Sequence, residues 1–241
     1  MDLGIMGKVA LVTASSKGLG RASGEALAAD GAKVIICGRG EETLRATEAG
    51  IRSAGGDVHA VVADVTDPAT PASLVAEAIR RFGGLDILVA NAGGPPPGRA
   101  LDLTDDQITD AVNANLTTSV RLVRAAVPSM RSAGWGRICC ITSWSVKQPM
   151  RELSLSNLAR TGLWAWAKTA AHDLFASGIT LNLACPGPHA TDRMLQLGGS
   201  DVPMGDPGDF GRLVAFLCSQ SAGYISGAAV MVDGAASLGL L

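Results

Sequence analysis

The chain has 241 residues, is 47% hydrophobic and 17% charged, and carries a formal net charge of −2. A chain of this length suits one large α/β domain. The small charge provides no field for nucleic acid or for an anionic membrane surface. The N-terminus lacks both a basic segment and a long apolar run, so we expect no signal peptide and no membrane span.

Seven short apolar segments alternate with segments of helical character along the chain. The predicted strands cover residues 8–13, 33–37, 58–63, 85–91, 136–142, 179–185 and 228–233. The predicted helices cover residues 19–30, 41–54, 69–82, 105–133, 151–176 and 208–219. Near-continuous apolar strands indicate a sheet covered on both faces, as in a parallel sheet. We therefore predict a single α/β domain with a doubly wound, seven-stranded parallel sheet and a ligand site at the carboxyl ends of its strands.

The first strand runs into "TASSKGLG", residues 13–20, and then directly into a helix. Gly18 and Gly20 would let the backbone approach a ligand, and a helix N-terminus presents unpaired N–H groups to a phosphate. Taken alone, this motif has an equally good alternative, in which the glycines only ease the packing of strand against helix.

The end of the second strand, "CGRGEE", lacks the acidic residue that would hold a ribose 2′-hydroxyl. Gly38 leaves space there, Arg39 follows it, and Lys17 lies in the first turn. Two cations at this place suit a 2′-phosphate, so we predict NADP(H) in preference to NAD(H). The alternative is that both side chains are solvated surface charges.

These motifs resemble the short-chain dehydrogenase/reductase family, in the group that includes β-ketoacyl carrier-protein reductases and glucose dehydrogenases. The similarity extends from Lys8 to Gly234 and implies a Rossmann fold. Its glycine-rich motif corresponds to Thr13, Ala14, Ser15, Ser16, Lys17, Gly18, Leu19 and Gly20, with Ala14 in place of a glycine. The other matching positions are Asp64, Val65, Asn91, Ala92, Gly93, Asn115, Pro186, Gly187 and Thr191. The resemblance implies that Asp64 and Val65 face the adenine, and that Pro186, Gly187 and Thr191 hold the nicotinamide carboxamide.

The catalytic positions of that family are only partly filled. Ser143 matches the family serine, but the positions of the tyrosine and the lysine hold Ser156 and Arg160. The only tyrosine of the chain, Tyr224, lies far from them in the sequence. The sequence therefore resembles an atypical subset with Ser/Arg in place of the usual Tyr/Lys.

This replacement removes the group that protonates the alkoxide formed by hydride transfer. A phenol has a pKa of about 10 that can be tuned downward, whereas an aliphatic hydroxyl is a far weaker acid. Arg160 keeps a positive charge on the same helix face as Ser156, four residues away. It can hold ribose hydroxyls or stabilise an oxyanion together with Ser143, but it cannot release a proton near neutrality.

Other residues are candidate proton donors, each with a plainer alternative. His189 follows the Pro186–Gly187 turn, and histidine titrates in a suitable range, but the favoured interpretation of His189 is a loop histidine facing water. Lys147 is either a catalytic residue or a charged residue at the rim of the cleft. Glu152 is interpreted as a carboxylate at the start of a helix. His59 and His172 are interpreted as structural. We expect residues 93–100, 144–153 and 188–206 to form the substrate pocket.

Five cysteines, Cys37, Cys139, Cys140, Cys185 and Cys218, show no C-x-x-C spacing and mostly lie in apolar runs. This usage is typical of a reducing cytoplasm, and we expect a cytoplasmic protein without a metal site. The family resemblance implies a homotetramer or a homodimer in which the helices 105–133 and 151–176 pair with their copies. A surplus of apolar residues in these helices, including Leu158, Leu163, Trp164 and Trp166, is a common sign of such a buried interface.

Three functions are compatible with these observations. The first is an atypical, NADPH-dependent reductase of an activated small-molecule carbonyl compound. The second is a catalytically impaired NADP(H)-binding sensor or partner subunit. The third is a non-redox lyase or isomerase that uses the same cleft. Asn91, Asn115 and Ser143 favour the first function, whereas the missing Tyr/Lys pair favours the second.

Overall fold

The structure, a computed structural model, describes residues 2–199 and 203–239. Within these residues seven strands form one parallel sheet in the order β3-β2-β1-β4-β5-β6-β7. The strands are β1 (Val9–Val12), β2 (Lys33–Gly38), β3 (Asp57–Val62), β4 (Ile87–Ala90), β5 (Gly136–Ile141), β6 (Ile179–Pro186) and β7 (Ala229–Val232). The predicted α/β domain with a doubly wound, seven-stranded parallel sheet is confirmed.

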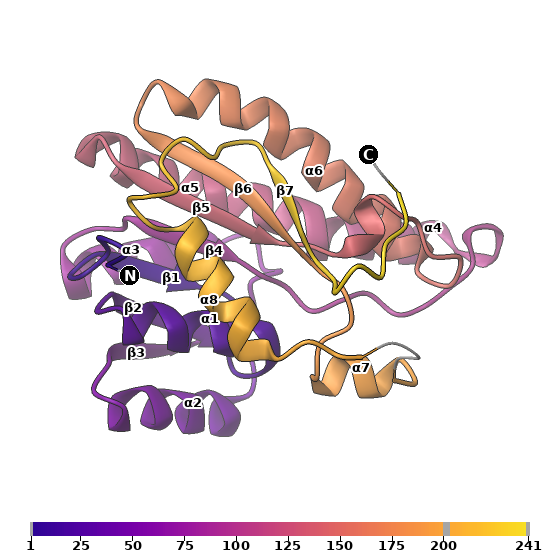
Figure 1. The fold of residues 1–241 in the computed structure, drawn as a ribbon, viewed down its shortest axis with the longest axis horizontal. Coiled ribbons are helices and arrows are strands. Elements are labelled where there is room, and N and C mark those ends of the chain that lie inside the picture. The colour runs from indigo at the N-terminus through magenta and orange to yellow at the C-terminus, as the bar shows by residue number, and fades with distance from the viewer. Residues whose placement is uncertain (1, 200–202, 240–241) are drawn as a thin grey trace.

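Helices cover both faces of this sheet (Figure 1). They are α1 (Gly18–Ala29), α2 (Glu41–Ser53), α3 (Thr70–Phe82), α4 (Asp105–Val112), α5 (Thr118–Ala133), α6 (Ser154–Phe175), α7 (Asp192–Gln196) and α8 (Pro207–Leu217). Leu27, Leu44 and Phe210, from α1, α2 and α8, belong to one buried cluster. Leu74, Leu122 and Leu163, from α3, α5 and α6, belong to the cluster on the other face.

The strands divide their side chains between the two clusters. In β1, Val9 and Leu11 pack with α3, α5 and α6, whereas Ala10 and Val12 pack on the opposite face. All four are at most 4% exposed. Successive side chains of a strand point to opposite faces, so a strand buried on both sides must be apolar at every position. This requirement accounts for the continuous apolar runs in the sequence.

The predicted helix 105–133 is two α-helices joined by a π-helical segment, Asn113–Thr117. The first begins with a capping box, in which Thr104 Oγ1 accepts from Gln107 N (3.2 Å) and Gln107 Oε1 accepts from Thr104 N (3.0 Å). The π-helical segment widens the helix at the positions around Asn115, and such segments often mark functional sites.

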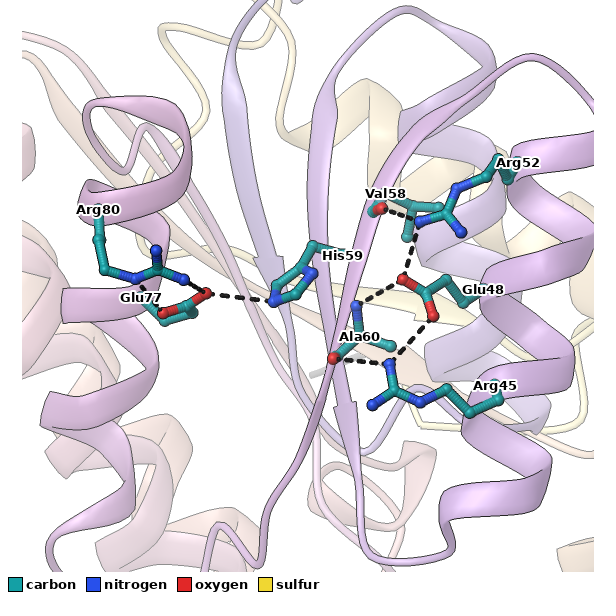
Figure 2. Close-up of polar contacts among 8 residues, drawn as sticks. All are labelled: Arg45, Glu48, Arg52, Val58, His59, Ala60, Glu77 and Arg80. Atoms are coloured by element: carbon teal, nitrogen blue, oxygen red, sulfur yellow. Dashed lines mark hydrogen bonds and ion pairs between the residues drawn. The ribbon is translucent and has the colours of Figure 1, made fainter.

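Side chains of α2 cover the free edge of β3 (Figure 2). Ala60 N donates to Glu48 Oε1 (3.2 Å), and Ala60 O accepts from Arg45 Nη1 (3.3 Å). Val58 O accepts from Arg52 Nη2 (3.1 Å). Glu48 also forms ion pairs with both arginines, at 3.1 and 3.0 Å. Backbone groups of an edge strand would otherwise be open for pairing with another chain.

A second polar group ties β3 to α3 (Figure 2). His59 Nε2 lies 3.1 Å from Glu77 Oε1, and the same oxygen accepts from Arg80 Nη2. The hydrogen bond from Arg80 lowers the pKa of Glu77. His59 therefore joins a strand to a helix, in agreement with the structural interpretation of this residue.

None of the described helices is long and apolar enough to cross a membrane. All five cysteines have free, buried thiols. Burial raises the pKa of Cys37, Cys140 and Cys218 to about 12. These thiols consequently remain protonated and unreactive near neutral pH.

Candidate active site

The candidate site lies at the carboxyl ends of four neighbouring strands. Thr13 follows β1, Asn91 follows β4, Ser143 comes shortly after β5, and Pro186 ends β6. These strands are adjacent in the sheet, so the topology brings the four positions to one edge. The strand order reverses between β1 and β4, which is where ligands bind in open α/β sheets.

Hydrogen bonds between Thr13 and Asn91 join the ends of β1 and β4. Thr13 Oγ1 donates to Asn91 O (2.7 Å) and accepts from Asn91 N (2.9 Å). The side-chain Nδ2 of Asn91 donates to Ala14 O (3.2 Å). Both side chains, predicted to bind cofactor, are thus engaged in holding the glycine-rich turn in place.

The turn after β1 needs a left-handed backbone at two residues. Ala14 has φ 46° and Gly18 has φ 59°. An L-residue other than glycine in this region costs about 1–2 kcal/mol, so Ala14 is strained where the family has a glycine. At Gly20 a Cβ atom would lie 2.5 Å from Ala14 O and 2.7 Å from Asn91 Nδ2. Only glycine fits at position 20.

The N-terminus of α1 fits a dinucleotide pyrophosphate. The N-cap residue, Lys17, makes no side-chain capping hydrogen bond, so the amides of Gly18, Leu19 and Gly20 have no such partner. Helix N-termini of this kind bind phosphate through free N–H groups and the helix dipole. Leu19 itself packs against the buried cluster under α1, which anchors this end of the helix.

Ser15, Ser16 and Gly38 occupy the space between β1 and β2. The hydroxyl of Ser15 is fully buried, donates to Val12 O (2.7 Å) and accepts from Cys37 N (3.0 Å), so its role is structural. A Cβ atom at Gly38 would lie 3.2 Å from Ser16 Oγ. Gly38 therefore leaves room beside Ser16 on the side where the adenosine ribose is expected.

The two cations predicted to hold a 2′-phosphate are exposed and lightly paired. The side chain of Lys17 is 62% exposed and lies 3.1 Å from Asp192. The side chain of Arg39 is 78% exposed and lies 3.8 Å from Asp64. Hydrogen bonds from Thr66 lower the pKa of Asp64, which keeps this carboxylate charged. Such exposed pairs are worth little, so both cations are available to a ligand.

Three further positions complete the predicted cofactor surface. Val65 is buried in the cluster beneath the sheet, next to Asp64. Ala92 is half-buried and Gly93 is exposed, and no heavy atom lies within 4 Å of the place where a Cβ atom of Gly93 would be. The chain after Asn91 therefore borders open space.

Ser143 and Ser156 come from different elements. Ser143 is half-buried, and its Oγ accepts from Ser145 N (3.2 Å). Ser156, in the first turn of α6, is 8% exposed and forms no hydrogen bond through its hydroxyl within the described residues. Tyr224 is 91% exposed and stacks on Phe175, the last residue of α6, so it does not supply the missing phenol.

Arg160 lies one helical turn beyond Ser156 and caps the end of β5. Its Nη1 donates to Ile141 O (2.9 Å) and to Thr142 O (3.0 Å), the two residues before Ser143. The residue is 7% exposed, and burial lowers the pKa of its guanidinium to about 10, with a contribution from the charge of Arg193. Arg160 therefore stays charged near neutrality.

Asn115 lies in the π-helical segment between α4 and α5. Its Nδ2 donates to Ala111 O (3.4 Å), and its Oδ1 is buried without a partner within the described residues. The neighbouring Leu116 packs closely on α6, where a Cβ atom at Gly162 would lie 2.7 Å from Leu116 Cδ1. A buried, unsatisfied oxygen next to α6 is typical of a site that binds water or a ligand.

Pro186, Gly187 and Thr191 lie at the end of β6 and at the start of α7. Gly187 N donates to Val232 O (3.0 Å), and a Cβ atom there would lie 2.6 Å from Asp233 Cβ. Thr191 is the N-cap of α7, a helix that the sequence did not predict. Its Cγ2 lies 3.7 Å from the position of a Cβ atom on Gly18, so α7 begins against the glycine-rich turn.

His189 is buried, and the interpretation as a loop histidine facing water is wrong. The residue is 5% exposed, and its ring packs edge-on against Phe210, with centroids 5.3 Å apart. Its Nδ1 lies 3.0 Å from Gly187 O, and its other edge faces Gly205. These contacts, with an aromatic ring and a backbone carbonyl, favour a structural role for His189. The sequence did not predict them, because Phe210 of α8 is 21 residues away along the chain.

Within the predicted substrate pocket, Arg193 makes a contact that the sequence did not indicate. Arg193, on α7, donates from Nη2 to Pro95 O (2.5 Å) and lies against Gly94. Lys147 lies over the ring of Trp164, at 5.9 Å, and Glu152 pairs with Arg99 at 3.1 Å. Residues 200–202 of the predicted pocket lie outside the described residues.

The sequence and fold match known oxidoreductases. A family described as Enoyl-(Acyl carrier protein) reductase matches residues 13–237. The chain is 35% identical over 240 residues to the 3-oxoacyl-(acyl-carrier-protein) reductase FabG of Escherichia coli (strain K12), covering 95% of this chain and 96% of that protein. It is 33% identical over 240 residues to Homo sapiens Dehydrogenase/reductase SDR family member 4, covering 94% of this chain and 86% of that protein.

The chain belongs to the short-chain dehydrogenase/reductase family. The crystal structure of the L-sorbose reductase from Gluconobacter frateurii complexed with NADPH and L-sorbose superposes on this chain with a TM-score of 0.90. It is 30% identical in sequence and covers 97% of this chain and 98% of that chain. As a short-chain dehydrogenase/reductase, the protein is an oxidoreductase of a family that binds nicotinamide cofactors.

Proposed function

We propose that this protein is an NADPH-dependent reductase of activated carbonyl compounds that works without a tyrosine general acid. The observation that carries the proposal is the position of Arg160. Its buried guanidinium is held on the carbonyls of Ile141 and Thr142, directly before Ser143. A fixed cation and a hydroxyl at one place can stabilise an oxyanion that forms during the reaction.

NADP(H), in preference to NAD(H), is the proposed cofactor, and when bound it supplies the hydride. The amides at the start of α1 would hold its pyrophosphate, and Lys17 and Arg39 would hold its 2′-phosphate. Both side chains are more than 60% exposed, and their ion-pair partners among the described residues are surface carboxylates. Asn91 and Thr13 would act indirectly by fixing the turn that carries these amides.

The proposed chemistry divides the work of the usual Tyr/Lys pair. Ser143 and Arg160 bind the carbonyl oxygen and stabilise its growing negative charge. Ser156 fills the place of the tyrosine, and water or the substrate itself provides the proton. Loss of a positioned general acid typically costs about 10²–10⁴ in rate, so the substrate must be a carbonyl compound that needs little help. Diketones, quinones and phenol-bearing aromatic ketones meet this requirement.

The second candidate function is a catalytically impaired NADP(H)-binding sensor or partner subunit. The absence of a phenol near Ser156 and the strained Ala14 favour it. A non-redox lyase or isomerase in the same cleft is the third candidate. We further propose a homotetramer or homodimer, because Leu158 on α6 is 46% exposed and Trp164 and Trp166 are only partly covered. The five free cysteines support a cytoplasmic location.

NADPH oxidation with a panel of carbonyl compounds, combined with calorimetric binding of NADPH and NADH, tests this proposal. Ser156→Ala should change turnover by less than about threefold, a difference below 1 kcal/mol. Ser143→Ala and Arg160→Ala should each lower turnover by about tenfold to a thousandfold. Should Ser156→Ala abolish turnover, the serine itself carries the proton.

A double variant, Ser156→Tyr with Arg160→Lys, restores the pair that is usual in the family. It should extend reduction to simple ketones that the native protein does not reduce. Tight NADPH binding with no carbonyl compound reduced by the native protein would instead support the sensor function.

A further inference from the structure

An excess of positive charge surrounds the end of β5. Arg160 comes from α6, Arg193 from α7 and Lys147 from the segment after Ser143. Within residues 2–199 and 203–239 none of these three cations has a carboxylate within ion-pair distance, although eleven ion pairs form elsewhere in this part of the chain. The nearest acidic neighbours in sequence, Asp192 and Glu152, are paired with Lys17 and Arg99.

The two arginines point to the same edge of the sheet. Arg160 is held on the carbonyls at the end of β5, and Arg193 on the carbonyl of Pro95, in the segment after β4. β4 and β5 are neighbours, with Ala90 opposite Cys140. The carbonyls that hold the two guanidinium groups therefore belong to segments that leave neighbouring strands of the sheet.

Charge effects within the site agree with this geometry. The charge of Arg193 adds to the effect of burial in lowering the pKa of Arg160. Burial raises the pKa of the Cys185 thiol, which lies 3.1 Å from Thr142 Oγ1, while Lys147 and Arg160 both oppose that rise. Arg160 is only 7% exposed and has no carboxylate partner among the described residues. A buried cation without a carboxylate is costly unless an anion joins it.

We propose that the substrate carries a carboxylate beside its carbonyl group, and that Arg193 binds this carboxylate while Ser143 and Arg160 bind the carbonyl oxygen. The inference rests on the reductase function proposed above and specifies its substrate class, a 2-oxo acid. A guanidinium matches a carboxylate with two parallel hydrogen bonds, which fixes the orientation of the neighbouring carbonyl.

In this reaction the carbonyl carbon gains a hydride from the reduced nicotinamide, and its π bond to oxygen breaks. The oxygen, held by Ser143 and Arg160, gains a proton from water, which leaves as hydroxide. A 2-oxo acid thus becomes a 2-hydroxy acid, and NADPH becomes NADP⁺. Arg193 takes no part in proton transfer and acts as a binding residue.

Matched substrates test this assignment. Pyruvate and 2,3-butanedione differ only in a carboxylate oxygen against a methyl group, and phenylglyoxylate and 1-phenylpropane-1,2-dione form a second such pair. We expect a higher kcat/KM for the acid in each pair. Arg193→Gln should lower the ratio of kcat/KM for the acid to kcat/KM for the diketone by about tenfold to a hundredfold, chiefly because the KM of the acid rises. Arg193→Lys should recover part of that ratio.

The control variant is Arg212→Gln, which removes the same charge from the exposed face of α8. It should leave the ratio at the native value. Preference of the native protein for the diketones, or an unchanged ratio in Arg193→Gln, would overturn the inference but not the reductase function. Weaker NADPH binding in Arg193→Gln would assign this arginine to the cofactor. If none of the four compounds is reduced while NADPH binds, the reductase function itself fails.

Discussion

Lys17 and Asp192 form an ion pair of 3.1 Å that joins the turn after β1 to the first residue of α7. The pair links two segments that would enclose a dinucleotide, the glycine-rich turn and the short helix after β6. Both side chains are more than 60% exposed, so the pair contributes little stability by itself. Lys17 can therefore exchange Asp192 for a phosphate at small cost.

Arg39→Ala should weaken NADPH binding about tenfold or more and leave NADH binding almost unchanged, because a charge-assisted hydrogen bond to the 2′-phosphate contributes roughly 1.5–3 kcal/mol. Calorimetry with both cofactors measures this. Arg131→Ala, an exposed arginine in the last turn of α5, is the control and should affect neither cofactor. Equal losses for NADPH and NADH in Arg39→Ala would remove the basis for NADPH preference.

Ala14→Gly should stabilise the protein by about 1 kcal/mol, because relief of the left-handed strain exceeds the entropy that glycine adds to the unfolded chain. Urea unfolding measures the change. Ala235, also left-handed with φ 63°, provides a matched variant away from the glycine-rich turn. Ala235→Gly should stabilise similarly without any effect on cofactor affinity. A destabilised Ala14→Gly would mean that the alanine methyl group packs usefully.

Glu48→Gln should destabilise the protein at pH 7 by about 1–3 kcal/mol, since it breaks charge-assisted bonds to Arg45 and Arg52. Burial alone would raise the pKa of Glu48, but the hydrogen bonds and charges around it lower the pKa below 4.5. A lowered pKa in the folded state stabilises above the unfolded value, and this stabilisation disappears as the pH falls through the folded value. The difference between native and variant proteins should therefore shrink below pH 4.5.

Thermal unfolding from pH 3 to pH 7 measures the effect of Glu48→Gln, with Glu42→Gln on the exposed face of the same helix as control. The control should follow the native curve at every pH. A constant gap between Glu48→Gln and the native protein across this range would contradict the role given to the charge.

Light scattering at micromolar concentration should show a homotetramer or a homodimer. Leu158→Glu should shift the mass toward the monomer, because Leu158 is an exposed apolar side chain on α6. Met6→Glu changes another exposed apolar side chain outside the helices and should leave the mass unchanged. A monomeric native protein would show that α5 and α6 bury their apolar residues internally, as Leu163 does.

The sheet was predictable because strands buried on both faces leave an uninterrupted apolar run. The sequence prediction for β6, 179–185, differs from the structure by one residue. The glycine-rich turn after β1 was predictable in the same way, because Gly18 has a left-handed backbone and Gly20 has no room for a Cβ atom. Features that depend on neighbouring residues, or on a pattern repeated along one element, can therefore be predicted from the sequence.

Features that depend on one distant contact were not predictable. α7 has five residues and too little periodicity to be recognised. The side chain of Arg193 is positioned by a hydrogen bond to Pro95 O, 98 residues away along the chain. His189 is buried because Phe210 of α8 packs against its ring. The π-helical segment at Asn113–Thr117 has the same apolar pattern as the helices beside it, so the sequence predicted one continuous helix.

The contacts of α2 with β3 have a consequence for how copies of this chain can associate. The outward backbone groups of Ala60 and Val58 are already hydrogen-bonded to side chains of Glu48, Arg45 and Arg52. The β3 edge of the sheet is therefore lined with charged side chains. A strand from a second copy would have to displace three charged partners to continue the sheet there. Growth of the sheet through the β3 edge is therefore blocked, so the homotetramer or homodimer proposed above would have to form through other surfaces of the chain.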